Sequence, residues 1–313
     1  MNNTFAQDVK EGLSARSKYL SSMYFYDDNG SRIFQEIMRM PEYYLTDSEF
    51  EILSLQAQQI TDAVGFDKPF NIIELGPGDG FKTFKLLEYL VKQNIEFHYV
   101  PIDISKEAID ILSDKLLERL PNLSIQAKVG DYFEALKDLK KNDTPSLLLF
   151  LGSNIGNYLE DKVDNLLTLF NQSMNKGDKL LIGVDLKKNP LIIQKAYLDD
   201  GGITKKFNLN LLLRINRELG ADFKIDDFDF YSNYNPETGE VKSYLVSLRN
   251  QKVHIKSLNQ TFAFRYDELI WTELSKKYSL EQIQEIAASN GFAIEQNFLD
   301  CKHYFVDSLW VKE

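Results

Sequence analysis

The chain of 313 residues has little of several features that define whole classes of protein. A single cysteine, Cys301, excludes an intrachain disulfide and a CxxC metal site. The three histidines, at positions 98, 254 and 303, are scattered without HExxH spacing, so we expect no metal ion. No apolar run approaches the roughly 20 residues of a membrane span, and the polar N-terminus is unlike a signal peptide. These absences predict a cytoplasmic protein with no membrane partner.

The chain also lacks clusters of basic residues. Charged residues make up 27% of it, the formal net charge is −11, and no long run has one sign. Phosphate binding needs grouped Lys and Arg, so we expect no nucleic-acid partner. What the chain does have is apolar residues, 43% of the total, which is enough for one large core or two smaller ones. Composition leaves the oligomeric state open.

Short apolar runs alternate with helical patterns in the first part of the chain. The runs predict buried strands at 71–76, 98–105, 124–131, 146–153 and 178–186. Ser105 can cap the next helix, which should stop at Pro121. This alternation predicts an α/β fold with a doubly wound sheet, the alternative being that some runs are core helices.

The pattern changes after residue 190. The segment 191–220 looks mostly helical, and 225–257 predicts antiparallel strands around a turn at 235–240. A capping box predicts a helix over 279–291, and strands near 293–300 and 304–312 should close the chain. We therefore expect an α/β core interrupted by an insert, which the mostly helical first 50 or so residues could join.

Three glycines follow the first predicted strand, at Gly76, Gly78 and Gly80. Glycines let a backbone pass close to a ligand, and the following helix offers free N–H groups. A dinucleotide motif needs GxGxxG, whereas here the spacing is GxGxG and Phe81 takes the third-glycine position. The loop therefore suits a ligand without a pyrophosphate, and a tight structural turn is the alternative.

Acidic residues end the next two strands. A carboxylate at Asp103 can accept both hydroxyls of a ribose, and Asp131 with Tyr132 can meet an adenine amine and stack on the ring. Each acid alone could be a cap or a solvated turn residue. Features on three successive strands favour a ligand, because open α/β sheets bind ligands at that edge.

This ordered set resembles the class I S-adenosylmethionine-dependent methyltransferases over about residues 60–190. The resemblance implies a Rossmann-like sheet that closes with an antiparallel strand, and S-adenosyl-L-methionine as the cofactor. The alternative of a nicotinamide dehydrogenase is disfavoured by Phe81 at the third-glycine position.

Further motifs resemble the histidine N-alpha-methyltransferase family of the ergothioneine pathway, over about residues 15–313. They are YFYDDNGS at 24–31, PEYY at 41–44, FLGSNIGN at 150–157, GVDL at 183–186, FNLN at 207–210, NREL at 216–219 and TELS at 272–275. The resemblance implies a second, α+β substrate-binding domain formed by residues 1–55 and 191–278. Residues 56–190 and 279–313 would form the methyltransferase domain.

The family resemblance also implies roles for individual residues. The cofactor would be bound by Tyr26, Gly76, Lys82, Asp103, Asp131 and Tyr132. The substrate would be bound by Phe34, Tyr43, Gly152, Asn157, Tyr197, Glu273 and Ser275, the last two holding an imidazole. One departure is Ser243, which stands where the family usually shows Met on the wall of the side-chain pocket.

The chemistry of these side chains suits a free amino acid. A zwitterion needs donors and acceptors without added net charge, which Tyr and Asn supply, and Glu can accept from a ring N–H. The competing interpretations are core packing for the aromatic residues, a turn for Asn157, and a solvated strand edge for Glu273 and Ser275.

The family resemblance therefore implies N-methylation of the α-amino group of L-histidine, giving the trimethylated betaine hercynine. The alternatives are the same chemistry on another amino acid, such as a tryptophan derivative, and a catalytically silent cofactor-binding regulator. No residue is identified as a general base.

Overall fold

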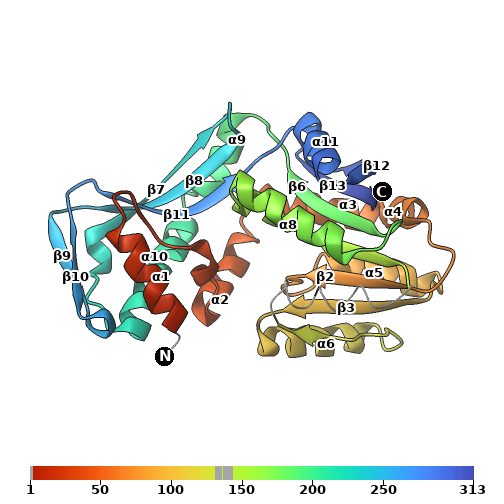
Figure 1. The fold of residues 1–313 in the computed structure, drawn as a ribbon, viewed down its shortest axis with the longest axis horizontal. Coiled ribbons are helices and arrows are strands. Elements are labelled where there is room, and N and C mark those ends of the chain that lie inside the picture. Colours follow the sequence, from red (N-terminus) through yellow and green to blue (C-terminus); the bar gives the residue numbers. More distant parts are fainter. Residues whose placement is uncertain (1–2, 131–135, 137–143) are drawn as a thin grey trace. The chain divides into compact units, whose positions relative to one another are not determined.

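The computed structural model describes residues 3–130, 136 and 144–313 (Figure 1). The chain divides into two compact units of two segments each. The smaller unit comprises residues 1–44 and 188–275, and the larger unit comprises residues 45–187 and 276–313. Among the described residues, no helix is long and apolar enough to cross a membrane.

The larger unit is built on a seven-stranded sheet in the order β12-β13-β6-β5-β2-β3-β4. Its strands are β2 (Phe70–Leu75), β3 (Phe97–Asp103), β4 (Lys128–Val129), β5 (Ser146–Phe150), β6 (Lys179–Asp185), β12 (Phe292–Leu299) and β13 (Phe305–Lys312). The strands from β6 to β4 are parallel, whereas β13 runs antiparallel to both β6 and β12. The predicted doubly wound α/β sheet with an antiparallel closing strand is confirmed. The third predicted strand is shorter than expected, because only two residues of 124–130 form a strand.

Helices alternate with the strands of this sheet. They are α3 (Tyr44–Leu55), α4 (Ala57–Val64), α5 (Thr83–Lys92), α6 (Lys106–Arg119), the 3₁₀ turn η3 (Asn154–Asn157), α8 (Glu160–Ser173) and α11 (Leu280–Ser289). Two expected caps are confirmed. The Ser105 hydroxyl accepts from the Ala108 N–H, and Ser279 and Gln282 form the capping box of α11.

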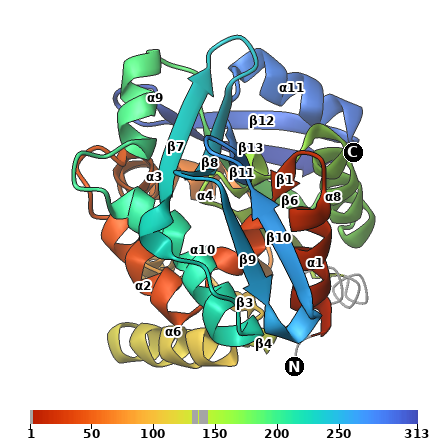
Figure 2. The ribbon, with the colours of Figure 1, turned by 90° about the vertical axis from the view of Figure 1, so that its left-hand side faces the viewer.

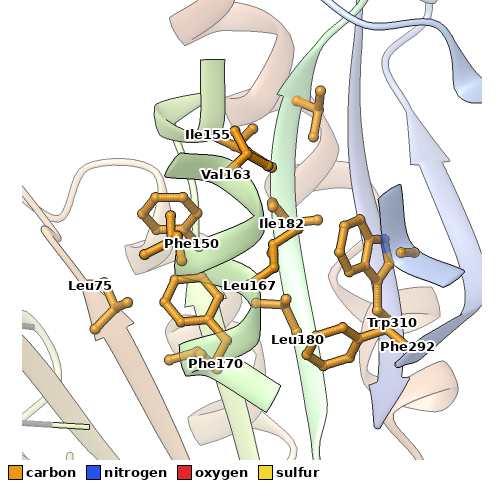
Figure 3. Close-up of a cluster of buried hydrophobic side chains, with 14 of the residues drawn as sticks. Leu75, Phe150, Ile155, Val163, Leu167, Phe170, Leu180, Ile182, Phe292 and Trp310 are labelled. Carbon is orange, nitrogen blue, oxygen red and sulfur yellow. The ribbon is translucent and has the colours of Figure 1, made fainter. Parts of the chain in front are cut away.

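The core of the larger unit packs α8 against the middle of the sheet (Figure 3). Phe170 of α8 lies with its ring centroid 5.3 Å from that of Phe150 on β5, edge to face. Trp310 on β13 is 1% exposed and packs with Phe292. Because these strands are buried, we expect the polar groups that contact a ligand to lie in the loops at the carboxyl ends of the strands.

The smaller unit holds a four-stranded sheet, in the order β1-β11-β8-β7, and a separate hairpin of β9 and β10 (Figure 2). Its strands are β1 (Lys18–Tyr19), β7 (Phe228–Asn235), β8 (Glu240–Ser247), β9 (Gln251–Ile255), β10 (Gln260–Phe264) and β11 (Leu269–Lys276). Its helical elements are α1 (Asn3–Ser14), η1 (Ser22–Phe25), α2 (Asp28–Ile37), α9 (Pro190–Tyr197), α10 (Ile203–Leu219), η4 (Ile225–Asp227) and η5 (Lys256–Leu258). The predicted antiparallel pair around the 235–240 turn is β7 with β8.

Asp27 joins the two main helices of the smaller unit. Its carboxylate caps α2 by accepting from the Gly30 N–H at 2.8 Å, and it accepts from Asn210 at 2.8 Å and Arg217 at 2.6 Å, both on α10. Burial acts to raise the pKa of Asp27, but the hydrogen bonds from Arg217, Gly30 and Asn210 outweigh it, and the pKa ends below its ordinary value. The N-terminal segment of the smaller unit is therefore connected to α10 through the ionised carboxylate of Asp27.

Candidate active site

The glycine loop follows β2 in the larger unit. Gly76 and Gly78 adopt positive φ angles of 65° and 58°, which favour glycine. A Cβ at Gly78 would meet nothing within 4 Å, so this turn of backbone faces open space. Phe81 stacks on Phe50 of α3 with ring centroids 4.5 Å apart. The loop therefore leaves its second glycine open to a ligand and uses Phe81 for packing.

Asp103 ends β3 at the same edge of the sheet. Its Oδ1 accepts from the Ser105 N–H at 2.9 Å, and among the described residues Oδ2 has no donor. The next residue, Ile104, is 74% exposed. An open glycine turn, a carboxylate oxygen and an exposed apolar side chain fit a nucleoside-bearing cofactor such as S-adenosylmethionine. The predicted Asp131 and Tyr132 lie outside the described residues.

Lys82 and Gly152 lie next to each other in the larger unit, although the sequence assigns them to cofactor and substrate respectively. A Cβ built on Gly152 would lie 3.5 Å from the Lys82 ammonium nitrogen. Both are bonded to Glu49 of α3, which accepts from the Gly152 N–H at 2.7 Å and from the Lys82 ammonium. The structure therefore brings these two predicted residues to one point.

The loop from Gly152 to Asn157 is held by its backbone. Gly152 and Ser153 have φ angles of 79° and 57°, and the Ser153 hydroxyl accepts from the Asp185 N–H at 3.0 Å. Gly156 packs so closely that an added Cβ would lie 2.5 Å from the Lys276 carbonyl oxygen. Asn157, at the end of η3, is exposed. The loop thus presents the predicted Asn157 amide on a backbone fixed at several points.

An aromatic chain runs through the smaller unit and contains four of the predicted residues. Ring centroids lie 5.5 Å apart for Tyr26 and Phe34, 6.3 Å for Phe34 and Tyr43, and 6.3 Å for Tyr43 and Tyr197. All three contacts are edge to face. Phe207 of α10 packs on both Tyr26 and Phe34, each at 5.8 Å. Residues from α2, α9 and α10 thereby form one continuous aromatic wall.

The aromatic chain ends at a polar pair. The Tyr197 and Ser275 hydroxyl oxygens lie 2.8 Å apart, and both residues are buried. Glu273 stands two residues before Ser275 on β11, so the two side chains share one face of the sheet. The predicted imidazole pair is therefore connected to the predicted aromatic residues within a single unit.

Ser243 takes part in a different set of contacts. It lies on β8, is 1% exposed, and its carbonyl accepts from the Thr272 hydroxyl at 3.1 Å. The same hydroxyl lies 2.7 Å from the side-chain oxygen of Asn208, which is fully buried. Thr272 alternates with Glu273 along β11, so it faces the opposite side of the sheet from the imidazole pair.

Three residues that contact or adjoin the predicted site residues were not identified from the sequence. Glu49 was passed over because an acid within a helical pattern normally faces solvent. Phe207 was noted only as part of a motif, and Ile104 only as strand residue. The burial of the Glu49 carboxylate, at 0% exposure, is seen only in the structure. No local sequence pattern predicts which distant group will pair with a buried acid.

The order of the larger sheet, its open glycine turn and its edge carboxylate are those of a Rossmann-like, S-adenosylmethionine-dependent methyltransferase. The family model for a "Histidine-specific methyltransferase, SAM-dependent" matches residues 5–312. The chain therefore belongs to this family of histidine-specific methyltransferases.

Named relatives resemble the chain over most of its length. The "Histidine N-alpha-methyltransferase" of Mycobacterium tuberculosis (strain CDC 1551 / Oshkosh) is 34% identical over 284 residues, 90% of this chain and 87% of the relative. The "Ergothioneine biosynthesis protein 1" of Schizosaccharomyces pombe is 29% identical, over 89% of this chain but 37% of that protein. A solved S-adenosylmethionine-dependent methyltransferase from Clostridium acetobutylicum is 13% identical, over 84% of this chain and 92% of that one, with a TM-score of 0.46.

Proposed function

We propose that this enzyme transfers methyl groups from S-adenosylmethionine to the α-amino nitrogen of L-histidine, in three steps that end at the betaine hercynine. The observation that carries the proposal is the aromatic chain from Tyr26 to Tyr197, which ends at the Tyr197–Ser275 hydroxyl pair. The family membership of the chain and the names of its relatives support histidine as the substrate.

The cofactor supplies an electrophilic methyl group on a sulfonium centre. In the larger unit, the open turn at Gly78, the carboxylate of Asp103 and the ammonium of Lys82 would hold it. Asp103 suits the ribose hydroxyls because its Oδ2 is an acceptor without a described donor. Lys82 suits a carboxylate of the ligand, as a cation at the start of α5.

The aromatic wall suits a nitrogen that loses a proton before each methyl transfer, becomes positively charged after it, and ends as a quaternary ammonium. Each added methyl removes an N–H donor, so hydrogen bonds are lost from step to step. The face of an aromatic ring attracts a methylated ammonium without needing an N–H, and cation–π contacts of this type contribute about 0.5–2 kcal/mol. Phe34 and Tyr43 can therefore serve the later steps as well as the first, and Tyr26, which is 48% exposed and packs on Phe34, would contact the cofactor.

Glu273 and Ser275 suit the imidazole. An ionised Glu accepts only, whereas a Ser hydroxyl donates or accepts, so the pair fits a neutral ring in either tautomer. The hydroxyl of Tyr197, 2.8 Å from that of Ser275, fixes the orientation of the serine. We assign Tyr43 and Asn157 to the carboxylate and amine of the substrate, since both offer polar groups without net charge.

Mass spectrometry of histidine incubated with the protein and S-adenosylmethionine tests the proposal. The expected products are histidine carrying one, two and finally three added methyl groups on the α-nitrogen. Tryptophan and phenylalanine are offered in parallel under the same conditions. Methylation of tryptophan in preference to histidine would favour the alternative substrate, and cofactor binding without any methylated amino acid would favour a silent regulator.

A further inference from the structure

The charges of three buried carboxyl groups act on the Lys82 ammonium in the larger unit. They belong to Glu49 of α3, Glu74 of β2 and Asp307 of β13, which are 0%, 3% and 0% exposed. The Lys82 side chain retains 22% exposure. Glu74 has its own donors in Thr83 at 2.6 Å and Tyr99 at 2.5 Å. The carboxylate that pairs with Lys82 is therefore that of Glu49.

The two oxygens of Glu49 serve two different segments. Oε1 accepts from the Gly152 N–H at 2.7 Å, and Oε2 accepts from the Lys82 ammonium. Gly152 opens the loop proposed to meet the amino acid, whereas Lys82 precedes the helix proposed to meet the cofactor. The buried Glu49 side chain thus connects a residue assigned to the cofactor with a residue assigned to the amino acid.

The middle of β6 is shaped to admit this carboxylate. A Cβ at Gly183 would collide with Oε1 of Glu49 and lie 3.2 Å from Oδ1 of Asp307. Gly183 is a strand residue without a positive φ, so its backbone does not require glycine. The missing side chain instead leaves space for the approaching carboxyl groups, a common use of glycine within a strand.

The pKa values of Asp307, Lys82 and Glu74 all lie above their ordinary values in this cluster. Burial, followed by the charge of Glu49, raises the pKa of Asp307 well above its ordinary value. Burial acts to lower the pKa of Lys82, but the Glu49 carboxylate outweighs it and the pKa ends above its ordinary value. Burial raises the pKa of Glu74, against its hydrogen bonds from Thr83 and Tyr99. The raised pKa of Lys82 favours the ammonium form that donates to Glu49.

We propose that Glu49 is a positioning residue that holds the Lys82 ammonium and the Gly152 amide in one arrangement, and so links cofactor binding to the geometry of the substrate loop. The inference rests on the proposed function, which assigns Lys82 to the cofactor and Gly152 to the amino-acid side. Glu49 itself is 0% exposed and is assigned to neither ligand. It acts by fixing the two groups that are assigned to them.

A double-mutant cycle with S-adenosylhomocysteine tests the link, with dissociation constants measured by calorimetry. Glu49→Gln and Lys82→Met should each weaken S-adenosylhomocysteine binding about tenfold. The double variant should bind no more than about twentyfold more weakly than wild type, because either single change already breaks the contact between Glu49 and Lys82. Asp47→Asn, an exposed carboxylate on the same helix, is the matched control and should change binding less than twofold. Effects that multiply to about a hundredfold would overturn the proposal, as would a Glu49→Gln variant that binds like the control.

A second measurement does not require a Glu49 variant to fold. Selective ¹⁵N-glycine labelling makes the Gly152 amide observable by NMR, and Lys82→Met should shift this resonance because the ammonium polarises Oε2 of its acceptor. Lys92→Met, at the far end of the same helix, is the control and should leave it in place. A Gly152 resonance that responds equally to both changes contradicts the proposal.

Histidine methylation by the wild type is measured alongside, which separates this inference from the proposed function. If the two substitutions are coupled but the protein methylates no histidine, the proposed function is wrong and the positioning role stands. If the protein methylates histidine but the effects of the two substitutions multiply independently, the positioning role is wrong and the proposed function stands.

Discussion

The hydroxyl oxygens of Tyr197 and Ser275 lie 2.8 Å apart, joining α9 to β11 across 78 residues of sequence. Tyr197 is also the last ring of the aromatic chain that begins at Tyr26. Through this contact, the residues proposed to surround the amine are connected to the residues proposed to select the side chain. Substitutions at the two ends should therefore have distinguishable effects.

Tyr197→Phe keeps the ring and removes the partner of Ser275. We expect the KM for histidine to rise about fivefold, corresponding to the loss of about 1 kcal/mol for one hydrogen bond. S-adenosylhomocysteine affinity should stay within twofold of wild type, because Tyr197 and its partner Ser275 are both assigned to the substrate. Steady-state kinetics and calorimetry measure the two quantities. A change confined to cofactor affinity would remove Tyr197 from the substrate side.

Glu273→Ala should lower the preference for histidine. Loss of the acceptor leaves an imidazole N–H unpaired, at a cost of about 1–3 kcal/mol, whereas an apolar ring loses an unfavourable carboxylate neighbour. The ratio of kcat/KM for histidine over tryptophan should fall at least about tenfold. Both substrates are assayed on wild type and variant. A constant ratio would mean that the imidazole is recognised elsewhere, and Ser243 would be examined next.

Asp103→Ala should weaken S-adenosylmethionine binding by about 1.5–3 kcal/mol, the scale of hydrogen bonds to a charged group. The reason is the position of the carboxylate at the end of β3, with Oδ1 on the Ser105 N–H and Oδ2 without a described donor. Calorimetry measures the affinity, and thermal unfolding verifies the fold. Asp110→Ala, on the exposed side of α6, is the control. Equal affinities for the two variants would rule out a ribose contact at Asp103.

Asp27→Asn should destabilise the protein in a pH-dependent manner. The pKa of Asp27 is lower in the folded chain, so its stabilising contribution is present above its unfolded value and is lost as pH falls through the folded value. At pH 7 we expect a loss of about 0.5–2 kcal/mol, the range for a helix cap. The difference between variant and wild type should shrink below about pH 4. Urea unfolding at several pH values measures it, and a pH-independent difference would contradict an ionised cap.

Much of the fold follows from short-range patterns. The strands of the larger unit appear in the sequence as apolar runs, and the caps at Ser105 and Ser279 appear as spacings of a few residues. The turn of β7 into β8 is likewise marked by its own residues. Strands, helix caps and turns of this kind depend on residues within a few positions of each other, so the residue types alone predict them.

The boundaries between units depend on more distant contacts. The sequence placed the first division after residue 55, whereas the larger unit begins at residue 45 and takes in nearly all of α3. That helix carries Glu49, whose partners Lys82 and Gly152 lie 33 and 103 positions away. An amphipathic pattern predicts the helix but not the sheet on which it packs, so the division could not be predicted locally.

The sequence by itself determined the residue types of the candidate site, the glycine loop and the alternation that builds an α/β sheet. Only the tertiary structure decided which of these residues meet. It brought Tyr26, Phe34, Tyr43 and Tyr197 into one aromatic chain, and it buried Glu49 against Gly183. The physical reason is that ring contacts and buried ion pairs form between segments far apart in the chain, where their energies depend on packing and desolvation rather than on local spacing.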